Sequence, residues 1–384
     1  MNRDTHRPGP RSAFRSIGAG PVGTLYHTLA SGDLFKVVSI LGSFVEIERE
    51  NVATYSMPWR TRFWCYRHGF YSYSGVLYGL NRHNVDSYLS DLERRKAIPI
   101  NGTPWKVAQL KLAFHEVLAH THRHLLTDVV AVIQDGEPYP LPSSGVTAES
   151  VEELLDELAP GSRLIAKPAG GWAGTGIFSI GQSEDGFTLD GAPIRRAALT
   201  ARLRDLDGYL LDRAVEQATY ASTIYPHAAN TLRIVTMIDP DSREPFVGSV
   251  IHRFGTDASQ PVDNWSRGGI CAGVDDDTGR LGPATGKPKS GPPTFVETHP
   301  DTGSRIEGTT IPSWDVVRDE ILSVADTYKH LWRYLGWDVV VTDDDGSFTI
   351  IEANASPDVD LLQVHEPLLD DPRVRRFYSA HGVI

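Results

Sequence analysis

The sequence has few cysteines, few lysines and no long apolar run. Its two cysteines, Cys65 and Cys271, are far apart and lack metal-binding spacing, which excludes a disulfide framework and a zinc knuckle. The most apolar stretch near the N-terminus, residues 34–47, is interrupted by Lys36 and is too short to span a bilayer. Residues 1–15 lack the apolar core of a signal peptide, so we expect a flexible tail there. These absences predict a cytoplasmic protein with reduced thiols and no membrane insertion.

The chain is acidic, and it uses the two acidic and the two basic residue types unevenly. The formal net charge of −12 argues against nucleic acid as a partner, because such binding needs clustered basic residues. The chain has 31 Asp against 18 Glu and 29 Arg against 8 Lys. Two explanations stay open: a protein that folds in high salt, and a GC-rich genome that favours arginine codons. Neither bears on the fold.

The length and the apolar pattern predict an α+β protein with several subdomains. The 384 residues, 40% of them apolar, suffice for two or three cores. We expect an N-terminal accessory or substrate region at 16–105, a second block at 106–217 and a third at 218–384. The first block is rich in aromatic residues and contains a polar, helix-like run at 86–96.

The expected elements of the other two blocks follow from apolar periodicity and from glycine and proline breaks. The second block is expected to contain a helix at 106–124, a strand at 129–133, a helix at 148–158, a Gly-rich hairpin at 164–180 and a strand at 209–211. The third is expected to contain strands at 232–238, 246–252, 337–341 and 348–352, one helix at 313–335, and a Pro/Gly-rich insertion at 281–312. Antiparallel sheets would form the framework of both blocks.

A Gly-rich hairpin between two expected strands is the first candidate site. Lys167 ends one strand and is followed by Gly170, Gly171, Gly174 and Gly176. Glycines let backbone N–H groups approach phosphate oxygens, and the lysine adds a point charge. The pattern is neither a P-loop nor a dinucleotide fingerprint. Phosphate binding and an ordinary Gly-rich turn both remain open on these residues alone.

Oxygen donors gather at the ends of the last two expected strands. Asp338 lies on one strand, and Glu352 and Asn354 lie two residues apart on the next, so that both face the same side. Two carboxylates and an amide suit Mg²⁺ bound to nucleotide phosphates. The alternative is that these carboxylates bind no metal, because carboxylates are common at hairpin ends. The acidic run at 343–345 is expected to be a solvated turn.

Arginines and an asparagine form a third candidate group. Arg233 lies within an apolar strand, where an unpaired guanidinium group is costly. It therefore either pairs with a buried acid or faces an anionic ligand. Arg253, Asn264 and Arg267 follow along the chain, the last of them directly before two glycines.

The order of these motifs resembles that of the ATP-grasp ligases. The C-terminal part is similar to the ribosomal-protein-modifying glutamate ligases, and it resembles the sugar-transfer-associated ATP-grasp family still more. The resemblance covers roughly residues 80 to 370. The segments that carry it are Asn230–Thr236, Asp263–Asn264 with Gly268–Gly269, His299–Gly303, Ile311–Trp314 and Gly336–Asp338. One departure is Asp358, where related ligases usually have glycine.

The resemblance implies an ATP-grasp fold, in which two α+β subdomains grip ATP, with an N-terminal accessory region. It also implies roles for individual residues. Lys111 and Lys167 would hold the ATP phosphates. Asp212 to Val215 would be the hinge whose backbone reads adenine, and Glu216 is a candidate for the ribose. Asp338, Glu352 and Asn354 would hold one or two Mg²⁺ ions, with Mn²⁺ as the alternative. The transferred phosphoryl group and the acid would be acted on by Arg233, Arg253, Asn264 and Arg267.

The function that the resemblance implies is ATP-dependent, ADP-forming ligation of a carboxylic acid and an amine through an acyl phosphate. The partners would be small-molecule acids and amines, such as glycans, nucleotide sugars or amino acids in polysaccharide or natural-product biosynthesis. Two alternatives are a kinase-like phosphotransferase on the same fold and a non-catalytic nucleotide-binding partner of a glycosyltransferase system. The oligomeric state is open, a dimer included.

Overall fold

The computed structural model describes residues 34–170 and 175–384, with side chains from Phe44 onward. The described chain forms two compact units, which meet along the sequence within the 3₁₀ helix η3 (Ile98–Asn101). The expected tail at 1–15 lies outside the described residues. The expected boundaries at 105/106 and 217/218 stay predictions. None of the described helices combines the length and hydrophobicity needed to cross a lipid bilayer.

The first unit is helical and contains the described chain up to Ile98 together with Pro288–Pro293 and Pro367–Ile384. Its helices are α2 (Leu34–Thr54), α3 (Trp59–Arg67), α4 (Ser72–Leu77), η2 (Val85–Ser87), α5 (Asp91–Ala97), η6 (Leu368–Asp370) and α13 (Pro372–Ala380). The polar run at 86–96 is not one helix, because Ser90 and Glu93 form a capping box that starts α5 at Asp91.

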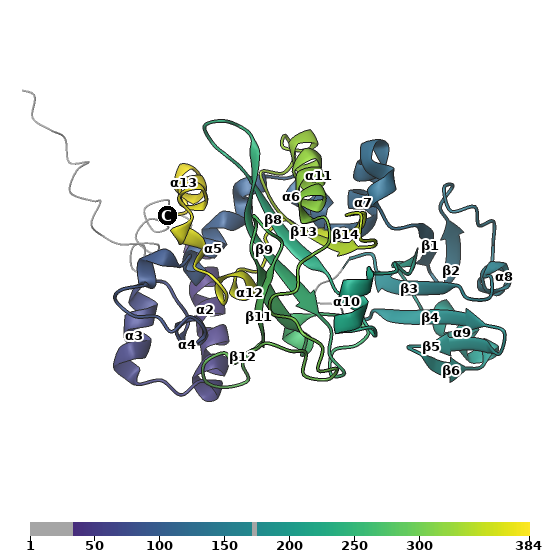
Figure 1. The fold of residues 1–384 in the computed structure, drawn as a ribbon, viewed down its shortest axis with the longest axis horizontal. Coiled ribbons are helices and arrows are strands. Elements are labelled where there is room, and N and C mark those ends of the chain that lie inside the picture. The colour runs from purple at the N-terminus through teal and green to yellow at the C-terminus, as the bar shows by residue number, and fades with distance from the viewer. Residues whose placement is uncertain (1–33, 171–174) are drawn as a thin grey trace, which may run out of the picture. The chain divides into compact units, whose positions relative to one another are not determined.

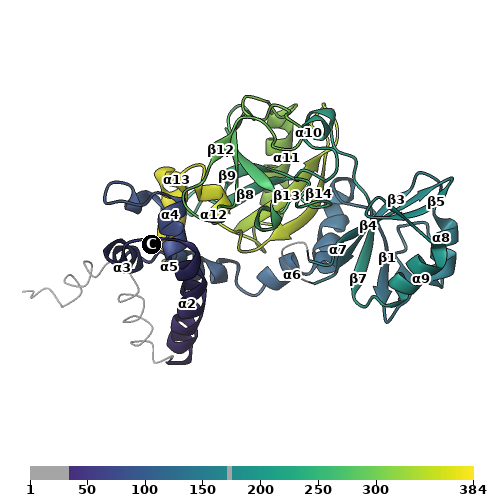
Figure 2. The same ribbon diagram turned by 90° about the horizontal axis from the view of Figure 1, so that it is seen from below.

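The second unit, Pro99–Lys287 with Thr294–Glu366, contains two seven-stranded antiparallel sheets. The first sheet has the order β2-β1-β7-β3-β4-β5-β6, and helices α8 and α9 cover it (Figures 1 and 2). Its elements are β1 (Val129–Gln134), β2 (Glu137–Pro140), α8 (Val151–Glu157), β3 (Arg163–Pro168), β4 (Phe178–Ser183), β5 (Gly186–Leu189), β6 (Ala192–Ile194), α9 (Arg196–Arg204) and β7 (Tyr209–Arg213).

The second sheet has the order β12-β11-β10-β9-β8-β13-β14. Every residue of β8 and β13 is buried, and the apolar face of α11 packs into the same core as this sheet (Figure 1). The elements are α10 (Thr219–Ile224), β8 (Leu232–Ile238), β9 (Pro245–Phe254), η5 (Trp265–Arg267), β10 (Ile270–Val274), β11 (Leu281–Gly286), β12 (Phe295–Val296), α11 (Trp314–Thr327), β13 (Tyr334–Val341), β14 (Phe348–Asn354) and α12 (Asp360–Gln363).

The expected α+β class with antiparallel sheets is confirmed, but three expected elements are wrong in detail. The helix at 106–124 is two helices, α6 (Trp105–Gln109) and α7 (Lys111–His122), followed by η4 (Arg123–Leu125), because Leu110 is extended. The helix at 313–335 ends at Thr327, and its last residues begin β13. The insertion at 281–312 contains β11 and β12, which extend the second sheet.

Candidate functional site

A cavity of about 520 Å³ lies in the second unit and is lined by strands of both sheets and by the loops around them. Many of the residues predicted from the sequence line it. They are Lys111, Lys167, Asp212, Val215, Arg253, Asn264, Asp338, Glu352 and Asn354. The cavity therefore brings together side chains that are more than 200 residues apart in the sequence.

Lys167 and Asp212 form a buried ion pair on neighbouring strands of the first sheet. Lys167 lies on β3 and Asp212 on β7, and the lysine Nζ contacts Asp212 Oδ2. Thr127 Oγ1 donates to the same oxygen at 3.2 Å. The other oxygen, Asp212 Oδ1, is buried and accepts no hydrogen bond from the residues that the structure describes. Because buried acceptors are nearly always satisfied, this oxygen indicates a ligand that donates a hydrogen bond.

The Gly-rich hairpin is described only in part. Gly171 and Gly174 lie outside the described residues. Gly176 has φ +79°, and a Cβ atom there would lie 2.7 Å from the Tyr209 hydroxyl, so glycine is required for the turn. Among the described residues of the hairpin, Thr175 and Ile177 line the cavity, whereas Gly170 and Gly176 do not.

Lys111 connects the start of α7 to both sheets. Its backbone N–H donates to the carbonyl of Ala169, directly after β3, at 3.3 Å. Its side-chain Nζ lies 3.5 Å from Glu352 Oε2 on β14 of the second sheet. The Glu352 side chain is 33% exposed, so a ligand can reach this carboxylate.

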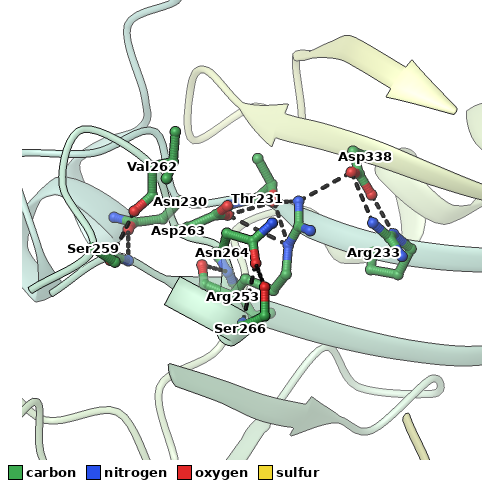
Figure 3. Close-up of polar contacts among 12 residues, drawn as sticks. Asn230, Thr231, Arg233, Arg253, Ser259, Val262, Asp263, Asn264, Ser266 and Asp338 are labelled. Carbon is green, nitrogen blue, oxygen red and sulfur yellow. Dashed lines mark hydrogen bonds and ion pairs between the residues drawn. The ribbon is translucent and has the colours of Figure 1, made fainter. Parts of the chain in front are cut away.

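Asp338 is the centre of a buried charge network on the second sheet (Figure 3). It lies directly opposite Arg233 on β8, and both its oxygens accept from this guanidinium group, with Nη2 to Oδ2 at 2.9 Å. Arg253 Nη2 donates to Oδ2 at 3.0 Å. Burial raises the pKa of Asp338, but Arg233 and Arg253 outweigh it and bring the pKa to about 2. The buried-acid alternative for Arg233 is thus the one present in the structure.

Arg253 is also held from its other side (Figure 3). Its Nε donates to Thr231 Oγ1 at 2.9 Å and lies 3.5 Å from Asp263 Oδ2. Burial lowers the pKa of Arg253, whereas Asp263 and Asp338 raise it above its ordinary value. The two carboxylates therefore keep this buried guanidinium group charged at the cavity wall.

The oxygen donors predicted to hold a metal lie together at the edge of the second sheet. Asp338 pairs with Glu352 across β13 and β14, and Asn354 Nδ2 lies 3.5 Å from Asp338 Oδ2. Among the described residues, no group of three or more His, Cys, Asp or Glu side chains is arranged to hold a metal ion. Glu352 and Asn354 fit a hard cation, whereas both oxygens of Asp338 are occupied by arginines.

Other predicted residues lie elsewhere or have local partners. Asn264 lines the cavity, but its Oδ1 accepts from the backbone N–H of Ser266 at 3.0 Å and caps η5. Within the described chain, Arg233, Arg267 and Glu216 are not among the lining residues. Three further residues of the cavity wall, Thr127, Thr231 and Asp263, were not predicted from the sequence as site residues. The motifs around Asn230 and Asn264 could have drawn attention to the last two, whereas Thr127 gives no signal.

Two facing antiparallel sheets around this cavity define an ATP-binding protein of the ATP-grasp fold. A model of the sugar-transfer associated ATP-grasp family matches residues 108–372, which is more than half of the chain. The chain therefore belongs to this family, and the resemblance of its motifs is confirmed.

Similar solved structures include two ligases and a macrocyclase. An L-amino acid ligase from Bacillus licheniformis has 13% identity and a TM-score of 0.32, covering 66% of this chain and 41% of that chain. The D-alanine–D-alanine ligase from Coxiella burnetii has 10% identity and a TM-score of 0.34, covering 72% and 59%. The macrocyclase MdnC from Microcystis aeruginosa MRC, bound with precursor peptide MdnA, has 11% identity and a TM-score of 0.37, covering 73% and 63%.

This chain thus spans between 41% and 63% of the length of these three structures. Likenesses at this level support no inference about activity or substrates. No protein with a curated description matches the sequence.

Proposed function

We propose that the protein is an ATP-dependent, ADP-forming ligase that joins a carboxylic acid to an amine through an acyl phosphate. The observation that carries this proposal is the cavity itself. It combines two lysines, a buried acceptor at Asp212 and the oxygen donors Glu352 and Asn354 in one cavity. The chain's membership of an ATP-grasp family supports ATP as one substrate.

The contacts of the Lys167–Asp212 pair support a nucleotide site. Among the described residues Asp212 Oδ1 is a buried acceptor without a hydrogen-bond partner, and the 6-amino group of adenine is a donor that suits it. Val215, after β7, lines the same cavity. Lys111 and Lys167 would neutralise the phosphates as point charges. Arg253 would face the transferred phosphoryl group, where a fixed charge favours the transition state.

Glu352 and Asn354 would hold Mg²⁺, with Asp338 as a third donor if an arginine releases it. When bound, the ion would neutralise phosphate charge. The residues of this chain would otherwise bind and orient the reactants. The acid's carboxylate oxygen attacks the γ-phosphorus and ADP leaves. The amine nitrogen then attacks the acyl carbon, phosphate leaves, and the amine releases a proton. Exclusion of water from the cavity during turnover would protect the intermediate from hydrolysis.

The decisive experiment is isotope transfer from the acid. ADP release is first measured with a panel of acids and amines, and active acids are then prepared with ¹⁸O in the carboxylate. Ligation through an acyl phosphate transfers one ¹⁸O atom to the released phosphate, and hydroxylamine in place of the amine gives a hydroxamate. A stable phosphorylated product without released phosphate would instead identify a phosphotransferase. ATP binding without turnover on any acid would identify a non-catalytic partner.

A further inference from the structure

Two segments without strand structure form one end of the cavity wall. Residues 260–264 belong to the loop between β9 and β10, and residues 226–229 lie between α10 and β8. They meet at Gly255, where an added Cβ atom would lie 2.5 Å from the Cβ of Ala228. No residue larger than glycine fits there without a shift, because Gly255 packs closely against the side chains of Ala228 and Tyr225.

A turn at residues 299–303 ties both segments down. His299 Nε2 hydrogen-bonds the carbonyl of Gly255 at 2.7 Å, at the start of the β9–β10 loop. Thr302 Oγ1 donates to the carbonyl of Ile224 at 2.7 Å, at the start of the other segment. Asp301 Oδ2 accepts from the backbone N–H of Asp257 at 2.9 Å. One short turn therefore contacts the residues that lead into both lining segments.

The His299 side chain is fully committed to this arrangement. It is 1% exposed, and its ring stacks on Tyr225 with centroids 4.9 Å apart. Nδ1 accepts from the backbone N–H of Asp301 at 3.2 Å, which leaves the proton on Nε2 for the Gly255 carbonyl. The backbone N–H of Gly255 donates to Asn230 Oδ1 at 3.0 Å. The backbone carbonyl and N–H of Gly255 are thus both held by side chains, those of His299 and Asn230.

We infer that His299 is a positioning residue. It fixes the width of the cavity between residues 226–229 and 260–264, where we place the acid or amine that binds beside ATP. The inference rests on the proposed function. His299 acts through Gly255 and does not itself line the cavity. Lys167 and Asp212, proposed for the nucleotide, are held by contacts within the first sheet. Arg253, proposed for the transferred phosphoryl group, lies 3.5 Å from Asp263 of the β9–β10 loop, so a change at His299 should act on the second substrate and on turnover rather than on the affinity for ATP.

The test compares His299→Phe, which keeps an aromatic ring against Tyr225 but loses both hydrogen bonds, with His299→Gln, which keeps a donor and an acceptor. Exposed His330→Phe is the matched control. We expect the phenylalanine variant to raise the KM of the acid or amine by about tenfold, the size expected for a lost buried hydrogen bond, with ATP affinity within about twofold. Glutamine should restore part of the loss.

Two further measurements keep the inference separable from the proposed function. Amide hydrogen exchange in residues 224–229 and 255–264 should become faster in His299→Phe and stay unchanged in β3 and β4, with or without any turnover. Gly255→Ala should reproduce the effect, because a methyl group forces the two walls apart. Unchanged exchange in both segments overturns the inference. So does an equal loss of ATP and substrate binding together with a large fall in Tm.

Discussion

Arg233 and Asp338 face each other at matched positions of β8 and β13, and the guanidinium group of Arg233 contacts both oxygens of the Asp338 carboxylate. The pair is almost fully buried in the centre of the second sheet. Removing one partner of such a pair leaves an uncompensated buried charge, which costs more than the pair contributes. This relationship makes Arg233 a structural residue in the ligand-free protein, whatever contact it makes with phosphate.

Arg233→Met should therefore destabilise the ligand-free protein. The stranded Asp338 carboxylate should lower the free energy of unfolding by about 3 kcal/mol, and less to the extent that Arg253 compensates. A thermal melt should show a fall of about 6 to 12 °C. The double variant Arg233→Met/Asp338→Leu should recover most of the loss, because the unpaired charge is gone. A melt of Arg233→Met that is unchanged would contradict the structural role.

The same network predicts acid sensitivity at low pH. The folded pKa of Asp338, about 2, lies below the ordinary value of 3.8. The ionised carboxylate therefore contributes its full stabilisation above about pH 4, and this contribution is lost as the pH falls through about 2. It is worth on the order of 2 kcal/mol. Urea melts between pH 5 and pH 2 measure it. Asp338→Asn should be less stable at pH 5 but should lose less stability on acidification, and parallel curves for the two proteins would contradict the assignment.

Much of the fold was predictable because its signals are local. The strands β8 and β14 are apolar runs bounded by turns, and the hairpin around Gly176 requires a left-handed residue. The errors arose where the chain passes from one type of secondary structure to another without a break in the apolar pattern. The apolar pattern of α11 runs on into residues that pair with β8, because both elements bury the same core. Nothing local marks that change.

Many residues that line the candidate cavity could be selected from the sequence, but their contacts could not. Residue type and order were enough to select Asp338, Glu352 and Asn354 as oxygen donors. The pairing of Asp338 with two arginines depends on the registers between β8, β9 and β13, which only the folded sheet specifies. The same holds for Asp212, since Lys167, which contacts its Oδ2, is 45 positions earlier in the chain.

Lys167 and Asp212 should have separable effects on the nucleotide. Lys167→Ala should raise the ATP KM, because the lysine would grip the ground state and transition state alike, and it also strands the buried Asp212 carboxylate. Asp212→Asn keeps the size of the side chain but removes its charge. It should weaken ATP binding by about tenfold and narrow the preference for ATP over GTP, which lacks the 6-amino group. Calorimetric titration with both nucleotides measures this, and an unchanged ATP/GTP ratio would contradict the assignment of Asp212 Oδ1 to adenine.

Glu352→Gln and Asn354→Ala should each abolish turnover while the fold is kept. Each change removes an oxygen donor proposed to hold Mg²⁺ at the phosphates, and neither opens a core cavity, since the Glu352 side chain is 33% exposed. Its ion pair with Lys111 is partly solvated, so we expect the Tm to shift by only a few degrees. Asp344→Asn, in the exposed turn between β13 and β14, is the control and should retain activity. ADP release is followed across a Mg²⁺ titration, and Mn²⁺ binding to each purified variant is followed by electron paramagnetic resonance. Near-normal ADP release from either variant at saturating Mg²⁺ would show that the metal is held elsewhere, and a large fall in Tm would show that the residue supports the fold instead.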